Sequence, residues 1–277
     1  MVCPALRKGK ALFSLDGKVA VVTGGGRGIG KGISHALAEA GARVVCTGRA
    51  EAPLEATVAA IRAAGGTALA VPQDITAPGA AQTIVARTLE AFGRLDIWVN
   101  NAGSADPADV GPLIDIDEGQ WDRVVDLNMK ATFFAAQAAA RAMTDGGSII
   151  NITSRSGSHP NPMTGQYGAA KAGVENLTQT MAVEWGHRNI RVNAVAPGVV
   201  VTEENAEFMS GPRAQKQIDT VPLGRLGTPE DVAGICVYLA ADEAAWVSGT
   251  VIQVHGASRI PIGYMAYLHK IAKARSA

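Results

Sequence analysis

Short apolar runs alternate with longer amphipathic segments along the whole chain. The apolar runs predict seven strands, at residues 19–22, 43–47, 67–71, 95–99, 148–153, 190–195 and 250–254. The amphipathic segments predict helices, one beginning near Ile29 and others at residues 53–64, 80–92, 118–143, 167–185 and 229–241. Apolar strands separated by helices indicate a parallel sheet covered on both faces. Right-handed crossovers then favour a doubly wound α/β fold with a seven-stranded parallel sheet.

No low-complexity linker or shift in composition divides the chain, so we expect one domain over residues 16–256, after a tail at residues 1–15. Residues 202–221 are polar with little periodicity, and they follow the sixth predicted strand, at the edge where such folds bind ligands. The extension at residues 257–277 combines apolar residues near helical spacing with several basic residues. We expect it to form a subunit-interface helix; a lid over a neighbour's active site or contact with an acidic partner is the alternative.

Composition narrows the classes of protein. The 277 residues are 47% hydrophobic and 18% charged, which is typical of a soluble globular protein with a large core. Lys plus Arg equals Asp plus Glu, so no overall charge favours nucleic acid or an anionic membrane. The three cysteines are far apart, so neither a disulfide framework nor a metal site is indicated. Without an apolar span or signal-like N-terminus, the expected compartment is the cytoplasm.

A glycine-rich turn joins the first predicted strand to the first helix. Gly24, Gly28 and Gly30 follow the strand in the spacing T-G-x-x-x-G-x-G. Glycine allows a sharp turn and a close approach of the backbone to a pyrophosphate, and the helix N-terminus behind it favours an anion. The alternative is a tight turn without a ligand. Its place in the first unit of a repeating strand–helix pattern favours a dinucleotide site of the Rossmann type.

Tyr167 and Lys171 are four residues apart in a predicted helix and therefore share one face. A nearby ammonium lowers the pKa of a phenol, and a phenol tuned in this way can exchange a proton with an alcohol or carbonyl oxygen. Ser154 ends the fifth predicted strand and can hold the same oxygen by a hydrogen bond. An isolated Tyr-x-x-x-Lys is usually a solvated helix face, so the hypothesis of a catalytic set depends on the neighbouring motifs.

Those motifs occur in the order that a known family has. After the glycine turn come Asn100-Asn101-Ala102-Gly103, Ser154, Tyr167-x-x-x-Lys171 and Pro197-Gly198 with Thr202 beyond. Over about residues 16–256 the chain resembles the short-chain dehydrogenase/reductase family. The resemblance implies Tyr167 as acid/base, Lys171 as its partner and ligand of the nicotinamide ribose, and Ser154 as substrate anchor. It also implies that Asn128 holds a water molecule that links Lys171 to solvent; the alternative is a buried Asn that only satisfies backbone groups.

The resemblance also implies the residues that hold the nicotinamide cofactor. Asp74 and Ile75 resemble the family's adenine-contacting pair, and Val200 and Thr202 match positions that meet the nicotinamide carboxamide. The full expected set is Gly24, Gly26, Arg27, Gly28, Ile29, Gly30, Arg49, Asp74, Ile75, Asn101, Gly103, Tyr167, Lys171, Val200 and Thr202.

The residues after the second predicted strand indicate which nicotinamide cofactor is used. An acidic residue near Gly48 would bind the ribose 2′-hydroxyl of NAD, but Arg49 follows Gly48 directly. Together with Arg27 in the glycine turn, it could clamp the 2′-phosphate of NADP(H). The alternative is two solvated arginines, and Glu51 would partly offset their charge. We therefore expect NADP(H).

Substrate identity is carried by loops 104–112, 155–165 and 202–220, which the sequence does not decode. The family's partners are small carbonyl or alcohol compounds, including 3-oxoacyl thioesters and ketosteroids. His159 lies between Ser154 and Tyr167 and could meet substrate, whereas a structural role is expected for His255, where the family commonly has Asp. Relatives are usually homotetramers, and helices 118–143 and 167–185 could supply the interface.

Three functions remain open at this point. The first is NADPH-dependent hydride transfer to a ketone. The second is an NAD-dependent alcohol dehydrogenase that runs in the oxidising direction. The third is a non-catalytic dinucleotide-binding sensor or scaffold on the same fold.

Overall fold

A computed structural model describes residues 11–104 and 106–258 of the chain. Seven parallel strands form one sheet, as the sequence predicts, and their order is β3-β2-β1-β4-β5-β6-β7. The strands are β1 (Val19–Thr23), β2 (Arg43–Gly48), β3 (Thr67–Pro72), β4 (Ile97–Asn100), β5 (Gly147–Ile152), β6 (Ile190–Pro197) and β7 (Val251–Val254). The chain therefore builds the sheet outward from β1 in one direction and then outward from β4 in the other.

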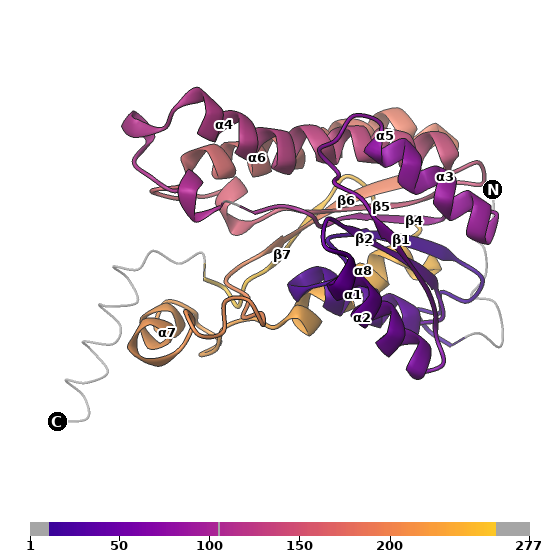
Figure 1. Ribbon diagram of the computed structural model, residues 1–277, viewed down its shortest axis with the longest axis horizontal. Coiled ribbons are helices and arrows are strands. Elements are labelled where there is room, and N and C mark those ends of the chain that lie inside the picture. Colours follow the sequence, from indigo (N-terminus) through magenta and orange to yellow (C-terminus); the bar gives the residue numbers. More distant parts are fainter. Residues whose placement is uncertain (1–10, 105, 259–277) are drawn as a thin grey trace.

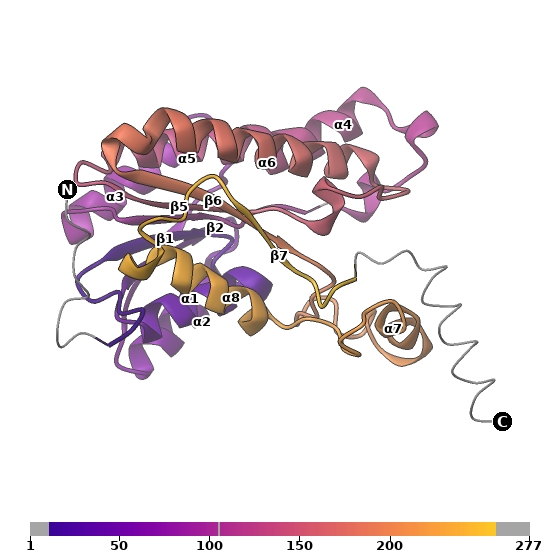
Figure 2. The same cartoon turned by 180° about the vertical axis from the view of Figure 1, so that it is seen from behind.

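Helices cover both faces of the sheet (Figures 1 and 2). The layer on one face consists of α1 (Gly28–Glu39), α2 (Glu51–Ala63) and α8 (Pro229–Ala240). The layer on the other face consists of α3 (Ala80–Phe92), α4 (Glu118–Val125), α5 (Ala131–Ala142) and α6 (Gly165–Trp185). The short helix α7 (Gly211–Ile218) lies apart from both layers, beyond the carboxyl ends of the strands.

Alternation along the strands divides the core in two. Val22 of β1 and Val99 of β4 pack toward α1, α2 and α8, whereas Val21 and the fully buried Trp98 pack toward α3, α5 and α6. Successive side chains of a strand point to opposite faces, so a strand apolar throughout must be covered on both. This explains why the strands read as unbroken apolar runs in the sequence.

The segment predicted as one helix at residues 118–143 is helical throughout residues 118–142, but it contains a π-helical turn that the sequence does not predict. Helix α4 ends at Val125, a π-helical turn covers Asp126–Lys130, and α5 begins at Ala131. Within the turn Asn128 donates its side-chain NH₂ to the carbonyl oxygens of Val124 and Ser104, at 2.9 and 2.7 Å. π-Turns are rare and concentrate at functional sites, and this one contains the asparagine that the family resemblance singles out.

Other elements differ from the prediction at their ends. Helix α2 begins at Glu51, α6 begins at Gly165 ahead of Tyr167, and β4 begins at Ile97. The segment predicted to be irregular at residues 202–221 contains α7, whose polar sequence hides its helical character. Of the predicted extension at residues 257–277, only Ala257 and Ser258 lie within the described residues, so its proposed interface helix is outside them, as is most of the tail at residues 1–15.

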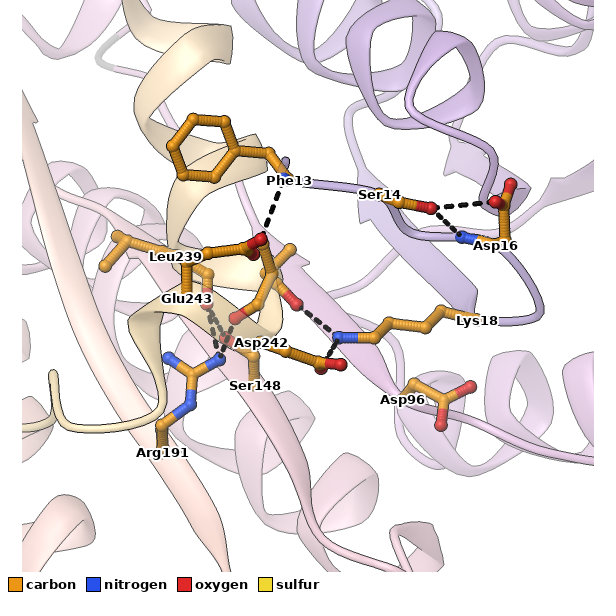
Figure 3. A network of polar contacts seen from close by, with 12 residues as sticks. Phe13, Ser14, Asp16, Lys18, Asp96, Ser148, Arg191, Leu239, Asp242 and Glu243 are labelled. Carbon is orange, nitrogen blue, oxygen red and sulfur yellow. Dashed lines mark hydrogen bonds and ion pairs between the residues drawn. The ribbon is translucent and has the colours of Figure 1, made fainter. Parts of the chain in front are cut away.

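The amino ends of the strands carry a separate polar network (Figure 3). Arg191 of β6 donates to the carbonyl oxygens of Leu239 and Ala241 at the end of α8, at 2.7 and 3.4 Å. Lys18 donates to the carbonyl oxygen of Ala240 at 2.9 Å and pairs with Asp242 at 2.7 Å. Cations at a helix C-terminus satisfy its free carbonyl groups and favour its dipole. This network therefore fixes α8 to the edge of the sheet opposite the one where the candidate residues gather.

Among the residues described, no helix is both long enough and apolar enough to cross a membrane.

Candidate active site

The carboxyl edge of the sheet brings the sequence-predicted residues together. The glycine turn follows β1, Asn101 follows β4, Ser154 follows β5, and Thr202 lies in the loop after β6. Strands β1 and β4 are neighbours, and the connections leave them in opposite directions. A crevice at such a switch point is where doubly wound folds bind their ligands.

The glycine turn is closely packed against its neighbours. Gly24 has φ +66°, and a Cβ atom there would lie 2.8 Å from Nδ2 of Asn101. A Cβ atom at Gly30 would overlap the carbonyl oxygen of Gly24. Helix α1 begins directly after the turn, and its N-cap residue Arg27 makes no side-chain cap, so the first N–H groups of the helix have no side-chain acceptor at this position. A backbone cradle without Cβ atoms and an uncapped helix N-terminus fit the pyrophosphate of a dinucleotide.

Asn101 fastens the end of β4 to the end of β1. Its backbone N–H donates to Oγ1 of Thr23 at 2.9 Å, and its side-chain NH₂ donates to the carbonyl oxygen of Thr23, also at 2.9 Å. The N–H of Ala102 shares the same Thr23 hydroxyl at 2.9 Å. The residue thus holds the floor of the crevice in place beside the glycine turn.

The residues proposed to select the cofactor lie at the rim. Arg27 and Arg49 are both exposed. Burial alone would raise the pKa of Asp74, but hydrogen bonds from Thr76 and the positive charge of Arg49 outweigh burial and lower it. Arg49 therefore lies close enough to Asp74 for their charges to interact. The residue that follows β2 and the residues that follow β3 are thus neighbours at the rim. Ile75 packs, partly buried, against the core beside them.

A cavity of about 370 Å³ lies between α1, α2 and the loop after β6. Its lining includes Gly26 and Arg27 of the glycine turn, Lys31 of α1, and Glu203 and Glu204. The carbonyl oxygen of Gly26 accepts a hydrogen bond from Thr57 of α2 at 3.3 Å, and Ile29 packs against the core below. The cavity thus begins at the turn and extends along α2, and its lining does not include Ser154, Tyr167 or Lys171.

Ser154, Tyr167 and Lys171 meet at the end of β5. Ser154 begins a short 3₁₀ turn, where its Oγ accepts from the N–H of Ser156 at 3.1 Å, and it makes a hydrogen bond with Tyr167. The ammonium nitrogen of Lys171 lies 5.5 Å from the centre of the Tyr167 ring and donates to the carbonyl oxygen of Ile152 at 3.0 Å. Helix α6 thus presents both residues on the face that packs against β5, as their spacing predicts.

Burial controls the pKa of both groups. It lowers the pKa of Lys171 to about 8, and it raises the pKa of Tyr167, while the hydrogen bond with Ser154 acts to lower it. The expected lowering of the Tyr167 pKa by the Lys171 ammonium is wrong, because the pKa is raised. Desolvation disfavours the phenolate more strongly than the hydrogen bond with Ser154 favours it.

Asn128 completes the buried end of the site. Its side chain is fully buried, and Oδ1 has no hydrogen-bond partner among the described residues. A Cβ atom at Gly103 would lie 2.6 Å from Oδ1 of Asn128 and 2.9 Å from Nζ of Lys171. Gly103 therefore lies against both the amide oxygen and the ammonium, and Oδ1 can still accept a hydrogen bond from a further donor.

The loop after β6 lies directly over the glycine turn. Val200 is buried, and Asn205 fixes the loop by donating to its carbonyl oxygen at 2.9 Å and accepting from the N–H of Thr202 at 2.8 Å. A Cβ atom at Gly28 would lie 3.2 Å from Cγ2 of Thr202 and 3.3 Å from Oε2 of Glu204.

An ion pair that the sequence did not indicate holds this loop to α1. Glu203 pairs with Lys31 at 2.6 Å. This ion pair joins the loop to the helix that carries the glycine turn, and the carboxylate of Glu204 lies close to Gly28. Only the charges themselves could have indicated such a role, because the segment shows no periodic pattern.

The two histidines of interest differ in position. His159 is partly buried in the loop between Ser154 and Tyr167, and its Nδ1 lies 3.1 Å from the hydroxyl of Ser158. His255 follows β7, and a Cβ atom at Gly198 would lie 2.7 Å from its Cβ. Over residues 11–104 and 106–258, no group of three or more His, Cys, Asp or Glu residues could hold a metal ion.

The chain matches one family model along most of its length. The model, described as Enoyl-(Acyl carrier protein) reductase, matches residues 24–257. This range begins at the first glycine of the turn and ends just after β7, so it includes every site residue described above.

Individual relatives show similar agreement. The 3beta-hydroxysteroid dehydrogenase 1 of Eggerthella lenta is 38% identical over 90% of this chain and 97% of its own length. The 3-oxoacyl-acyl-carrier-protein reductase of Synechocystis sp. is 38% identical over 88% of this chain and 98% of its own length. A structure from Beutenbergia cavernae, assigned as an NAD(P)-dependent gluconate 5-dehydrogenase with NADP bound at low occupancy, is 36% identical with a TM-score of 0.83, covering 90% of this chain and 99% of that one.

Proposed function

The chain belongs to the short-chain dehydrogenase/reductase family of oxidoreductases, and from this premise we propose that it is an NADPH-dependent enzyme that reduces a ketone to a secondary alcohol. Tyr167 is the acid/base, Ser154 the substrate anchor and Lys171 the partner of Tyr167. The observation that carries the proposal is the hydrogen bond between Ser154 and Tyr167 above a buried Lys171, beside a glycine turn without side-chain caps. In the cell we propose a cytosolic homotetramer, as expected from the composition and the family.

The chemistry of the residues follows from their protonation states. A raised pKa keeps Tyr167 in its neutral form at pH 7, and this form can donate a proton to a carbonyl oxygen that gains negative charge. The hydroxyl of Ser154 donates a hydrogen bond to the same oxygen and stabilises the developing charge. When bound, the nicotinamide cofactor supplies the hydride, so one hydride and one proton together convert the ketone to the alcohol.

Lys171 would return a proton to Tyr167, with a water molecule that Asn128 holds beside it. With a pKa of about 8, Lys171 is close to the pH at which it can both hold and release a proton. The unpartnered Oδ1 of Asn128 can accept a hydrogen bond from a water molecule near Gly103 and Lys171. This arrangement supports the proposal that Asn128 positions such a water molecule beside Lys171.

The residues present support NADP(H) rather than NAD(H). Gly24, Gly28, Gly30 and the start of α1 would hold the pyrophosphate, and Asp74, Ile75 and Asn101 would border the adenosine half. Arg27 and Arg49 are exposed at the rim, where a guanidinium can pair with the 2′-phosphate in a bidentate way. Val200 and Thr202, in the loop over the turn, would meet the carboxamide of the nicotinamide.

The first experiment is a titration of the purified protein with NADPH and with NADH, followed by fluorescence. We expect tighter binding of NADPH, and we expect Arg49→Glu to weaken NADPH binding at least tenfold more than NADH binding. Equal losses of affinity for both cofactors would contradict the proposal that Arg49 binds the 2′-phosphate. Tighter binding of NADH by the unaltered protein would instead favour the NAD-dependent alcohol dehydrogenase.

Substitution of Tyr167 by Phe separates the enzyme from a non-catalytic sensor. The variant removes only the phenolic oxygen, so we expect turnover to fall by roughly 10²–10⁴-fold while the Kd for NADPH stays within about twofold. The measurement is NADPH consumption with a panel of ketones, with the titration above as control. Turnover at the unaltered rate would contradict the assigned role of Tyr167.

A further inference from the structure

We propose that the substrate is an uncharged and largely apolar ketone or secondary alcohol, held between two loops with exposed apolar side chains. The inference rests on the proposed function, because it names the substrate class of that same site. It depends on two observations, which are the apolar side chains around the catalytic residues and the sign of the charges beside them.

The loop before α4 and the loop before α6 carry one group of exposed apolar side chains near Tyr167. Leu113, Ile114 and Met163 are 61%, 91% and 47% exposed. Large apolar side chains exposed together on loops mark binding surfaces more often than they mark the general surface of a protein.

Contacts place these loops against the catalytic helix. The side chain of Leu113 lies over Gly165, where a Cβ atom would come within 2.7 Å of Cδ2 of Leu113. The N–H of Gly111 donates to the carbonyl oxygen of Met163 at 2.8 Å, and the side chain of Gln166 donates to the carbonyl oxygen of Asp109 at 2.6 Å. Since Gly165 and Gln166 directly precede Tyr167, the apolar loops are fixed next to the acid/base.

Met163 is held in a strained conformation. Its φ is +73°, in the left-handed region that residues other than glycine rarely adopt. An exposed, strained methionine beside a catalytic residue has no role in the core. Strained backbone of this kind concentrates at ligand sites, and a flexible thioether adapts well to irregular apolar ligands.

A further exposed apolar side chain lies on the segment after α7. Leu223 follows α7, is 71% exposed, and its N–H donates to the carbonyl oxygen of Gly256 at 3.3 Å. Ser258, two residues further, accepts a hydrogen bond from Arg155 at 3.2 Å, and Arg155 directly follows the substrate anchor Ser154. The segment after α7 is therefore connected to the catalytic serine through the turn after β7. Figure 1 shows α7 and the start of α4 on the same side of the molecule, beyond the carboxyl ends of the strands.

The charged residues of the loops before α4 and after β6 disfavour an anionic substrate. Residues 104–117 contain Asp106, Asp109, Asp115 and Asp117 without any Lys or Arg, and residues 199–209 contain three glutamates without any Lys or Arg. Of these acids Asp109 is neutralised by Arg123 at 2.7 Å and Glu203 by Lys31 at 2.6 Å. Within the described part of the chain, the acids left without an ion pair are Asp106, Asp115, Asp117, Glu204 and Glu207. Next to Ser154 the cation Arg155 is engaged with Ser258. Like charges repel a thioester with phosphate groups, an acidic carrier protein or a sugar acid.

The test compares three carbonyl probes with the full chain and NADPH. These are 2-decalone as an uncharged apolar ketone, acetoacetyl-coenzyme A as an anionic thioester, and dihydroxyacetone as an uncharged polar ketone. We expect kcat/KM for 2-decalone to exceed both other values at least tenfold. A higher kcat/KM for acetoacetyl-coenzyme A or dihydroxyacetone would overturn the inference and leave the proposed function intact. Absence of turnover with all three probes would overturn the proposed function as well.

Variants of the exposed loops test the apolar contact directly. Leu113→Ser and Met163→Ser should each raise KM for 2-decalone about tenfold with little change in kcat, because substrate contact is lost and the chemistry is not. Leu89→Ser is the matched control, since Leu89 is 37% exposed on α3, at the other end of the molecule, and it should change neither constant. An unchanged KM in both loop variants would overturn the inference.

A charge reversal tests the electrostatic part. Asp115 is exposed in the loop before α4, so Asp115→Lys should leave the fold unaffected. We expect the variant to raise kcat/KM for acetoacetyl-coenzyme A about threefold or more at low salt and to leave 2-decalone unchanged. An unchanged ratio of the two values would show that these acids do not select against anions and would overturn that part of the proposal.

Discussion

The ammonium group of Lys171 is buried, and the loss of hydration disfavours its charged form. Burial lowers its pKa from 10.5 to about 8, so at pH 7 the folded protein holds a buried cation. Between those two pKa values the unfolded chain binds more protons than the folded chain, and the free energy of unfolding therefore rises with pH. Below pH 8 the full cost of the buried charge is present, and the cost falls as the pH rises from 8 toward 10.5.

This pKa shift predicts the behaviour of Lys171→Met. The variant should be inactive but more stable than the parent near neutral pH, because it removes the buried charge. Its advantage should shrink by about 2 kcal/mol between pH 7 and about pH 9.5. Chemical denaturation across that range measures both proteins. An advantage that is constant with pH would mean that Lys171 keeps an ordinary pKa in the folded state.

Gly103 is a second residue whose replacement has a defined expectation. A methyl group there would enter the space between Asn128 and Lys171, at 2.6 Å from Oδ1 and 2.9 Å from Nζ. We expect Gly103→Ala to lower kcat about tenfold or more, since it displaces whatever links the two groups. Gly234→Ala in α8 is the matched control, because a Cβ atom there meets nothing within 4 Å, and its kcat should stay unchanged. Equal kcat values in both variants would exclude the relay.

The sequence predicts that Ser154, Tyr167 and Lys171 lie together, and the structure brings them together, but their protonation could not be predicted. Tyr167 and Lys171 can be paired from their four-residue spacing, and Ser154 from its place at the end of an apolar run. The pKa direction of Tyr167 could not be predicted, because it depends on how deeply α6 packs against β5. The roles of Gln166 and Glu204 are hidden for the same reason, since both depend on contacts with residues distant in the sequence.

At the scale of elements, the loop after β6 adds negative charge where the cofactor's phosphates are expected. Oε2 of Glu204 lies 3.3 Å from the position of a Cβ atom at Gly28, and Glu203 holds the loop there through Lys31. An anion that binds at the start of α1 is therefore repelled by Glu204 unless this side chain moves away.

We predict that Glu204→Gln strengthens NADPH binding about threefold to tenfold by removing this repulsion. Fluorescence titration at low ionic strength measures the Kd, and the gain should decrease at high salt. Glu207→Gln in the same loop is the control, since Glu207 is exposed and lies farther along the chain. Weaker binding in Glu204→Gln would mean that the carboxylate supports the cofactor site.

The order and type of the elements along the chain could be predicted because most strands are runs of apolar residues. The π-helical turn at Asp126–Lys130 could not, because the helical spacing of apolar residues continues across it and the turn is held by hydrogen bonds of Asn128 to Val124 and Ser104. Helix α7 was missed because it lies apart from the main layers and needs no strong apolar stripe.

At the scale of the whole molecule, the carboxyl ends of the strands border the candidate site, whereas the amino ends carry the contacts that stabilise α8. We predict that Arg191→Met lowers the free energy of unfolding by about 2–3 kcal/mol, because the carbonyl oxygens at the end of α8 lose their charged donor (Figure 3). The kcat should stay unchanged, since Arg191 lies at the amino end of β6. Denaturation and steady-state kinetics measure the two effects, with the exposed Arg141→Met as control. A parallel loss of kcat would show that the two edges are coupled.

The parallel arrangement of the strands has a consequence for how this protein can be altered. Every loop that borders the site leaves the sheet at one edge, while the contacts that fasten α8 lie at the other. Mutational libraries restricted to residues 104–117 and 155–165 should therefore yield new substrate ranges without a matching loss of thermal tolerance. Libraries that reach Lys18 or Arg191 should yield mainly clones that express poorly.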